Sequence, residues 1–347
     1  MKKIIAYIIT AVLIMGCFSA CSTNGNTDKG STGTSKKVSI VTTIFPEYDW
    51  VMNVLGTNPA NADVTMLLDN GVDLHSYQPT ADDILKISTC DLFIYVGGES
   101  DEWVEDALKE ALNKNMVVLN LLDILGESVK EEEVVEGMQA EDEHDHHHDD
   151  EDEDHEDHEH EDHEHEEEIE YDEHVWLSLK NAEKIVNSIG NALEGIDSAN
   201  AGTYKANAAA YIEKLKSLDG EFQKAVSASS IKTLLFGDRF PFRYLVDDYG
   251  ISYYAAFVGC SAETEASFET ITFLSKKMDE LSLKAVMTIE GSDHRIAETI
   301  VRNTSSKDQK ILTLDSMQSV TSKDITNGVT YLSIMEKDLS ILKEALK

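Results

Sequence analysis

Short apolar segments rich in β-branched residues alternate with amphipathic segments along most of the chain. In the first half, strands are expected at residues 38–44, 64–68, 91–96 and 116–119, and helices at 46–55, 80–87 and 103–112. In the second half, strands are expected at 231–236, 252–256, 285–289 and 311–314, and helices at 241–249, 265–281, 295–303 and 325–346. This alternation predicts an α/β fold with two lobes, each a parallel sheet flanked by helices.

A long amphipathic segment at 199–226 separates the two alternating regions. Its apolar residues recur at helical spacing: Tyr204, Ala208, Tyr211, Ile212, Leu215, Leu218 and Phe222. We therefore expect an N-terminal lobe at 38–197, a linking backbone helix at 198–228 and a C-terminal lobe at 229–347. Open α/β sheets bind ligands beyond the carboxyl ends of their strands, so a ligand site is expected in the cleft between the lobes.

The N-terminus is typical of an exported lipoprotein. Residues 1–21 contain two lysines, an apolar stretch too short to span a membrane, and small residues next to cysteines. Cys21 is the expected site of lipid attachment because the sequence turns polar directly after it. Cys17 stays open, since Phe18 is unusual at the position three residues before Cys21. The polar residues 22–37 indicate a flexible tether, and we expect an extracytoplasmic protein anchored by lipid to the cell membrane.

Residues 141–168 consist only of Asp, Glu and His, and they hold nine of the twelve histidines of the chain. Without apolar side chains to offset the entropy of ordering, we expect a disordered loop at 127–170. Such a loop presents many imidazoles and carboxylates to a metal ion, above all zinc, whereas a plain acidic spacer needs no histidine. The formal net charge of −37 and the lack of a basic stripe argue against a nucleic-acid partner.

Only three histidines lie outside this run: His75, His174 and His294. His75 lies in a loop between a strand end and a capped helix start, although a loop histidine can simply be solvated. His174 lies where the acidic run gives way to Val175 and Trp176, so its backbone is about to enter a packed core. The chain thus joins a histidine-rich segment directly to a fixed histidine, which favours a segment that collects what the fixed site binds.

Several motifs together resemble the zinc- and manganese-binding solute-binding lipoproteins of ABC importers. They are HSYQPT at 75–80, the acidic histidine-rich insertion, DEHVWL at 172–177, the long linking helix, and GCSAETEAS at 259–267 as a variant of GxSxExEPS. The resemblance implies that the chain is a monomer that binds a metal ion and delivers it to an ABC permease. It also favours Zn²⁺ over Mn²⁺, because manganese-binding members generally lack the insertion.

The resemblance also implies a set of metal ligands. The two ligand histidines of the family map onto His75 and His174, and a carboxylate near the C-terminus maps onto Asp315, at the end of a predicted strand. The remaining ligand position aligns with Arg239, and arginine does not ligate metals at neutral pH. The adjacent Asp238 is therefore the predicted third ligand, with His294 as its rival.

Three further function classes stay open at this point. A manganese- or iron-binding member of the same family fits the ligand types equally well. A surface zinc buffer or adhesin would need the acidic run but no transport. A zinc hydrolase fits least, because catalytic zinc needs an open position and a general base, and no HExxH or comparable cluster occurs. We therefore expect no enzyme.

Overall fold

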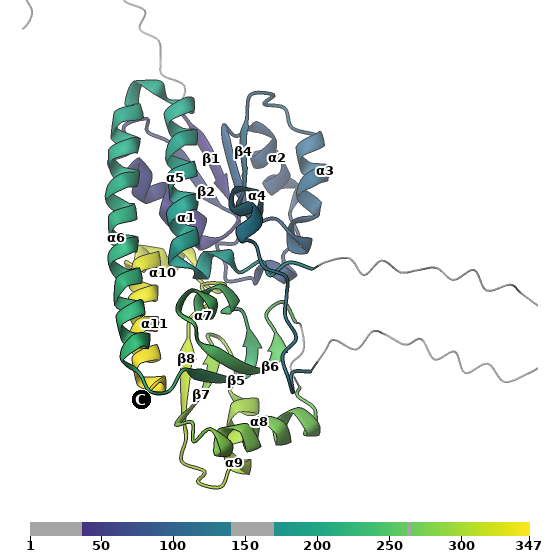
Figure 1. The fold of residues 1–347 in the computed structure, drawn as a ribbon. Coiled ribbons are helices and arrows are strands. Elements are labelled where there is room, and N and C mark those ends of the chain that lie inside the picture. The colour runs from purple at the N-terminus through teal and green to yellow at the C-terminus, as the bar shows by residue number, and fades with distance from the viewer. Residues whose placement is uncertain (1–36, 140–169, 262–264) are drawn as a thin grey trace, which may run out of the picture. The chain divides into compact units, whose positions relative to one another are not determined.

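The computed structural model describes residues 37–139, 170–261 and 265–347 (Figure 1). The expected signal segment with Cys17 and Cys21, the tether up to residue 36 and the acidic run lie outside these residues. Two four-stranded parallel sheets have the orders β2-β1-β3-β4 and β6-β5-β7-β8. The strands are β1 (Ser39–Thr42), β2 (Asp63–Met66), β3 (Leu92–Tyr95), β4 (Val117–Asn120), β5 (Thr233–Phe240), β6 (Ser252–Val258), β7 (Ala285–Ile289) and β8 (Lys310–Leu314).

Helices cover both sheets. The α-helices are α1 (Phe45–Leu55), α2 (Ala81–Thr89), α3 (Trp103–Lys109), α4 (Leu121–Leu125), α5 (Leu179–Ile196), α6 (Ala201–Ala228), α7 (Arg243–Tyr249), α8 (Phe268–Glu280), α9 (Arg295–Asn303), α10 (Ser322–Thr326) and α11 (Tyr331–Ala345). Short 3₁₀ turns are η1 (Leu74–Ser76), η2 (Glu99–Asp101), η3 (Gly126–Ser128), η4 (Val175–Leu177) and η5 (Ser198–Asn200). The predicted α/β fold with two parallel sheets and a long helix is thereby confirmed.

Two local expectations were wrong. The single helix expected at 325–346 is two helices, α10 and α11, because Gly328 adopts a φ of 94° and Thr330 caps α11 by accepting a hydrogen bond from the Ser333 N–H. Strand β5 also extends four residues past the expected end at 236. Its pairing with β6 shifts in register between Phe236 and Arg239, so the strand continues through an irregularity that redirects its last side chains.

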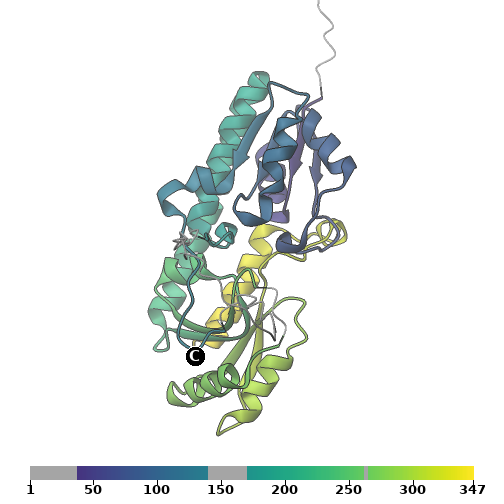
Figure 2. The ribbon, with the colours of Figure 1, turned by 90° about the vertical axis from the view of Figure 1, so that its right-hand side faces the viewer.

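Helix α6 packs against elements of both lobes. One face of it is buried, made of Tyr204, Ala208, Tyr211, Leu215, Leu218, Phe222 and Val226, while the expected Ile212 is half-buried. A single apolar cluster runs from β1 along α6 to α11. Figure 1 shows α6 passing α5 in one lobe and α11 in the other, and Figure 2 gives the view turned by 90°. Within the described residues, no helix is both long and apolar enough to cross a membrane.

The carboxyl group of Glu47 is fully buried at the start of α1. One of its oxygens accepts hydrogen bonds from the N–H groups of Thr43 and Ile44, at 2.8 and 3.3 Å. Burial, together with the nearby carboxylate of Asp101, raises the pKa of Glu47 to about 8. The folded state therefore keeps the proton in a pH range where the unfolded chain, with a pKa near 4.5, has lost it.

We expect this proton to make the free energy of unfolding fall as pH rises from about 4.5 to about 8, by up to about 1.4 kcal/mol per pH unit. The Glu47→Gln variant keeps the acceptor oxygen but cannot ionise, so its stability should exceed that of the wild type increasingly across this range. Urea unfolding of both proteins with chelator at pH 5, 6.5 and 8 measures the difference. A difference that does not change with pH would contradict the buried neutral acid.

Candidate metal site

His174 is fully buried at the start of η4, and its environment fixes its ring. The Asp172 carboxylate oxygen Oδ1 accepts hydrogen bonds from the His174 backbone N–H at 2.9 Å and lies 3.1 Å from ring atom Nδ1. The Trp176 ring packs against the His174 ring, and Trp176 Nε1 donates to the carbonyl oxygen of Ser316 at 2.8 Å. The imidazole therefore presents Nε2, and not Nδ1, to the space in front of it.

His75 lies in η1, in the loop that follows β2, and its side chain is 13% exposed. Its Nδ1 atom lies 2.8 Å from the hydroxyl of Ser100 and 3.5 Å from Oε2 of Glu173. Burial and the neighbouring His174 lower the pKa of His75 to about 3. The ring is therefore neutral at physiological pH, which is the form that binds metals.

The position of the Glu173 carboxylate requires a glycine at residue 98, which lies against it. Gly98 has a φ of 82°, and a β-carbon at this position would lie 2.3 Å from Oε1 of Glu173. Oε1 accepts a hydrogen bond from the Ser100 N–H at 2.9 Å, so the chain around η2 and the Glu173 side chain are held together. The loops that follow β2 and β3 are thus joined to the segment that carries His174.

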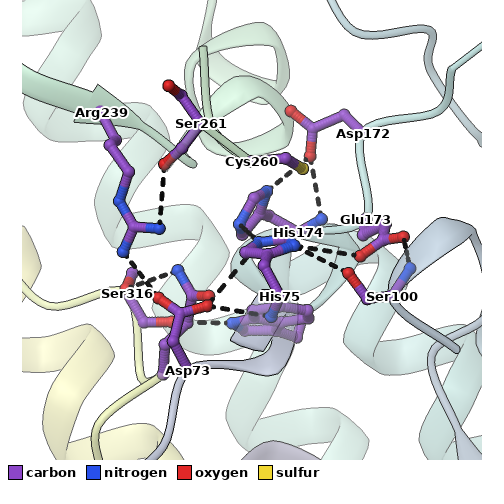
Figure 3. A network of polar contacts seen from close by, with 12 residues as sticks. Asp73, His75, Ser100, Asp172, Glu173, His174, Arg239, Cys260, Ser261 and Ser316 are labelled. Atoms are coloured by element: carbon purple, nitrogen blue, oxygen red, sulfur yellow. Dashed lines mark hydrogen bonds and ion pairs between the residues drawn. The ribbon is translucent and has the colours of Figure 1, made fainter. Parts of the chain in front are cut away.

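The two histidines point their Nε2 atoms at each other, 3.2 Å apart (Figure 3). Two nitrogen ligands of a tetrahedral zinc ion lie about 3.3 Å apart, given Zn–N bonds of about 2.0–2.1 Å. Each Nδ1 atom faces an oxygen atom, the arrangement that orients metal-bound histidines. The sequence-predicted pair His75 and His174 is therefore brought together with the spacing of two metal ligands.

Cys260 completes this group, and sequence reasoning did not select it as a ligand. Among the described residues, the donor atoms of His75, His174 and Cys260 lie within 4.8 Å of one another and form one potential metal-binding group. Cys260 follows β6, and its N–H donates to the Glu132 carboxylate at 3.3 Å. Burial and the Glu132 carboxylate raise the pKa of the Cys260 thiol above its ordinary range.

Asp238 and Arg239 lie at the irregular end of β5, and neither belongs to this group. The Asp238 carboxylate accepts hydrogen bonds from the N–H groups of Arg239 and Ile289, at 2.9 and 3.3 Å. Arg239 reaches across to the other lobe, where its Nη2 atom lies 2.6 Å from Oδ2 of Asp73. Although burial opposes it, the Arg239 guanidinium lowers the pKa of Asp73 below its usual value. Arg239, which aligns with a ligand position of the family that the sequence resembles, thus forms an ion pair between the lobes.

Asp315 and His294 also lie outside the group. The Asp315 carboxylate accepts a hydrogen bond from the Met317 N–H at 3.0 Å and lies 3.9 Å from Nζ of Lys337. It follows β8 and directly precedes Ser316, the residue that accepts the Trp176 hydrogen bond. His294 is half-buried at the start of α9, with a φ of 62°. The ligand roles of Asp238 and Asp315 stay predictions.

A cavity of about 540 Å³ lies beside the histidine pair. Asp73, Asp238, Arg239 and Glu290 are among its lining residues, while His75 and His174 are not. The Asp73–Arg239 ion pair therefore faces this cavity, next to the loop that carries His75.

Comparisons with known proteins test the resemblance that the sequence motifs suggested. The model of the family described as zinc-uptake complex component A, periplasmic (ZnuA), matches residues 40–345. The zinc-binding protein AdcA of Streptococcus pyogenes is 30% identical over 319 residues, which are 88% of this chain and 56% of AdcA. The chain thus spans little more than half the length of this relative. The high-affinity zinc uptake system protein ZnuA of Bacillus subtilis is 28% identical over 336 residues, 96% of each chain.

Solved structures give the same result. The Zn(II)-bound ZnuA-like domain of Streptococcus pneumoniae AdcA superposes with a TM-score of 0.65 at 26% identity, covering 89% of this chain and 99% of that domain. The metal-dependent lipoprotein YcdH of Bacillus subtilis has a TM-score of 0.67 at 24% identity, over 89% and 99% of the two chains, and it supports the fold alone. The resemblance read from the sequence motifs is confirmed, and the chain belongs to the family of the periplasmic zinc-uptake complex component A.

Proposed function

We propose that this chain captures Zn²⁺ outside the cytoplasm and delivers it to an ABC permease. His75 and His174 bind the ion through their Nε2 atoms, and Asp315 keeps its predicted role as a carboxylate ligand. Cys21 carries the lipid that anchors the chain as a monomer to the membrane. The zinc-named relatives and the histidine-rich run both support zinc over manganese or iron as the cargo.

One observation carries the metal-binding part of this proposal. The Nδ1 atoms of His75 and His174 both face oxygen atoms, whereas their Nε2 atoms face each other at 3.2 Å. When both Nδ1 atoms carry their protons, the two Nε2 lone pairs oppose each other in a buried space. That arrangement is unfavourable without a cation, and a zinc ion between the lone pairs converts their repulsion into two coordinate bonds.

The charges around the pair support a cation as the ligand. Asp73, Asp172 and Glu173 all approach the two imidazoles, while Arg239 is the cation paired to Asp73. The group takes His75 from a loop at the carboxyl end of the first sheet and Cys260 from a loop at the carboxyl end of the second. An ion held there contacts both lobes, which suits a protein that must bind its cargo and later release it.

The test is a zinc titration of the full chain that follows histidine NMR signals between pH 7 and pH 5.5. An exposed imidazole titrates near about 6.5 and the acidic neighbours in the run favour its protonated form, so zinc bound by residues 141–168 should be lost across this interval. The burial-lowered pKa of His75, about 3, means that protons compete little for its nitrogen, so the cleft site should keep its ion. Loss of both classes of zinc at the same pH would favour a surface buffer over a transport protein.

A further inference from the structure

We infer that Cys260 is the third protein ligand of the metal ion and binds it as a thiolate. This inference rests on the zinc site proposed above and assigns the position for which the sequence suggested Asp238. Zinc in a protein site takes four ligands, and the two neutral imidazoles supply no negative charge. The pair therefore needs a further donor close to it, and an anionic donor also offsets part of the charge of the ion. Within the part of the chain that the structure describes, Cys260 has both properties, and no other residue joins the two histidines in such a group.

The aligned ligand position cannot supply this donor. Arg239 occupies it, stays protonated and is paired with Asp73 at 2.6 Å. Its neighbour Asp238 is already engaged by two backbone N–H groups, one of them from β7 in the same sheet. The side chains at the irregular end of β5 therefore hold the lobes and the sheet together, and the third coordination position is left to the loop after β6.

The loop after β6 brings Cys260 to this position. Gly259 lies against the ring of His174, and a β-carbon on it would come within 3.0 Å of Cε1 and 3.1 Å of Nδ1 of that ring. The absence of a side chain at Gly259 lets the loop approach the imidazole closely enough for the next residue to reach the ligand group. The hydrogen bond from the Cys260 N–H to the Glu132 carboxylate also holds the loop in place.

The chemistry of sulfur decides which ion this site prefers. Thiolates bind zinc with Zn–S bonds of about 2.3 Å. They favour zinc over manganese, because manganese prefers oxygen donors. On binding, the S–H bond of Cys260 breaks, a Zn–S bond forms and the proton passes to solvent. Cys260 is therefore a specificity-determining residue: two histidines with carboxylates alone suit manganese, iron and zinc alike, whereas two histidines with a thiolate suit zinc.

Cobalt(II) provides the test, because thiolate ligation of cobalt gives a charge-transfer absorption band in the near ultraviolet that nitrogen and oxygen ligands do not give. The measurement uses the full chain with Cys17→Ser and Cys21→Ser, under a phosphine reductant, so that Cys90 and Cys260 are its remaining thiols. Cobalt bound by residues 141–168 adds no such band, since that run contains no sulfur. We expect the band to appear with the first equivalent of cobalt and to disappear when one equivalent of zinc is added.

Three variants of that chain, here called the parent chain, act as matched comparisons. Cys260→Ser should lose the band and bind zinc about 10- to 100-fold more weakly, whereas Cys90→Ser, at a buried thiol in the other lobe, should keep both. Asp238→Asn should keep the band as well. Tight zinc binding without a band in the parent chain would overturn the Cys260 assignment and leave the proposed function intact. Absence of any tight zinc site in the parent chain would instead overturn the proposed function.

Discussion

Replacing His174 with alanine is expected to weaken zinc binding at the cleft site by at least about 100-fold. Loss of a residue that only orients a metal ligand typically costs about 10- to 100-fold in affinity, and His174 is proposed to be a ligand itself. Its ring is fully buried and its Nε2 atom lies 3.2 Å from that of His75, so alanine removes one of the two paired nitrogen donors. Competition with a zinc-binding dye measures the loss.

The neighbouring residues provide controls for this experiment. His75→Ala should cause a similar loss with less structural cost, because the His75 side chain is 13% exposed, whereas His174 is fully buried, and His75 lies in a loop. His294→Ala should leave the affinity nearly unchanged, since His294 lies outside the ligand group. Thermal unfolding with chelator separates loss of the metal from loss of the fold. If His294→Ala weakened zinc binding more than His75→Ala does, the assignment of His75 and His174 as ligands would be refuted.

The fold followed from local patterns that the sequence displays directly. The alternation of β-branched strands with amphipathic helices predicted both parallel sheets, and the spacing of Tyr204, Tyr211, Leu215 and Phe222 predicted the buried face of α6. These patterns are readable because burial of one face repeats along an element with a fixed period. The break between α10 and α11 depends instead on Gly328 and a capping threonine, which fit the end of one helix as well as the start of another.

The histidine pair was predictable and the third donor was not. His75 and His174 stood out because so few histidines lie outside the acidic run, and the structure brings them together. Cys260 lay in a motif that was recognised, but it occupies a variable position of GxSxExEPS, so nothing in the spacing marked it. The one available signal was chemical: a thiol that follows a glycine at a strand's carboxyl end.

Asp238 was chosen from the sequence because it is the carboxylate next to Arg239, and the irregularity in β5 bears on that choice. Counting residues assumes that side chains alternate regularly along a strand, whereas the register shift between Phe236 and Arg239 alters which way the final residues point. The arginine that replaces a ligand then becomes useful in another way, because its ion pair with Asp73 connects the loop carrying His75 to the second sheet. The site thus combines ligands from three segments with a charged contact between the lobes.

Replacement of the acidic histidine-rich run is expected to change the number of zinc ions that the chain binds. Replacing residues 141–168 with a Gly/Ser segment of equal length should reduce the bound zinc from several ions to one. The equal length matters, because both ends of the loop are fixed to the folded body: the Gln139 N–H donates to the Ala256 carbonyl, and the Glu132 N–H donates to that of Glu170. A deletion of the run would strain both contacts. A loss of zinc binding could then come from a distorted fold and not from a lost ligand.

The remaining ion should bind with an affinity within about threefold of the original, because its proposed ligands lie outside the run and are oriented by Asp172, Glu173 and Ser100. Calorimetry of both chains at pH 7 measures the number and the affinity together. A third chain, in which only the nine histidines of the run become asparagine, keeps the carboxylates and shows whether imidazoles carry the weak sites. Loss of the tight site in the Gly/Ser chain, despite intact folding, would mean that the run supplies a ligand to the cleft, and that His75, His174 and Cys260 do not suffice to hold the ion.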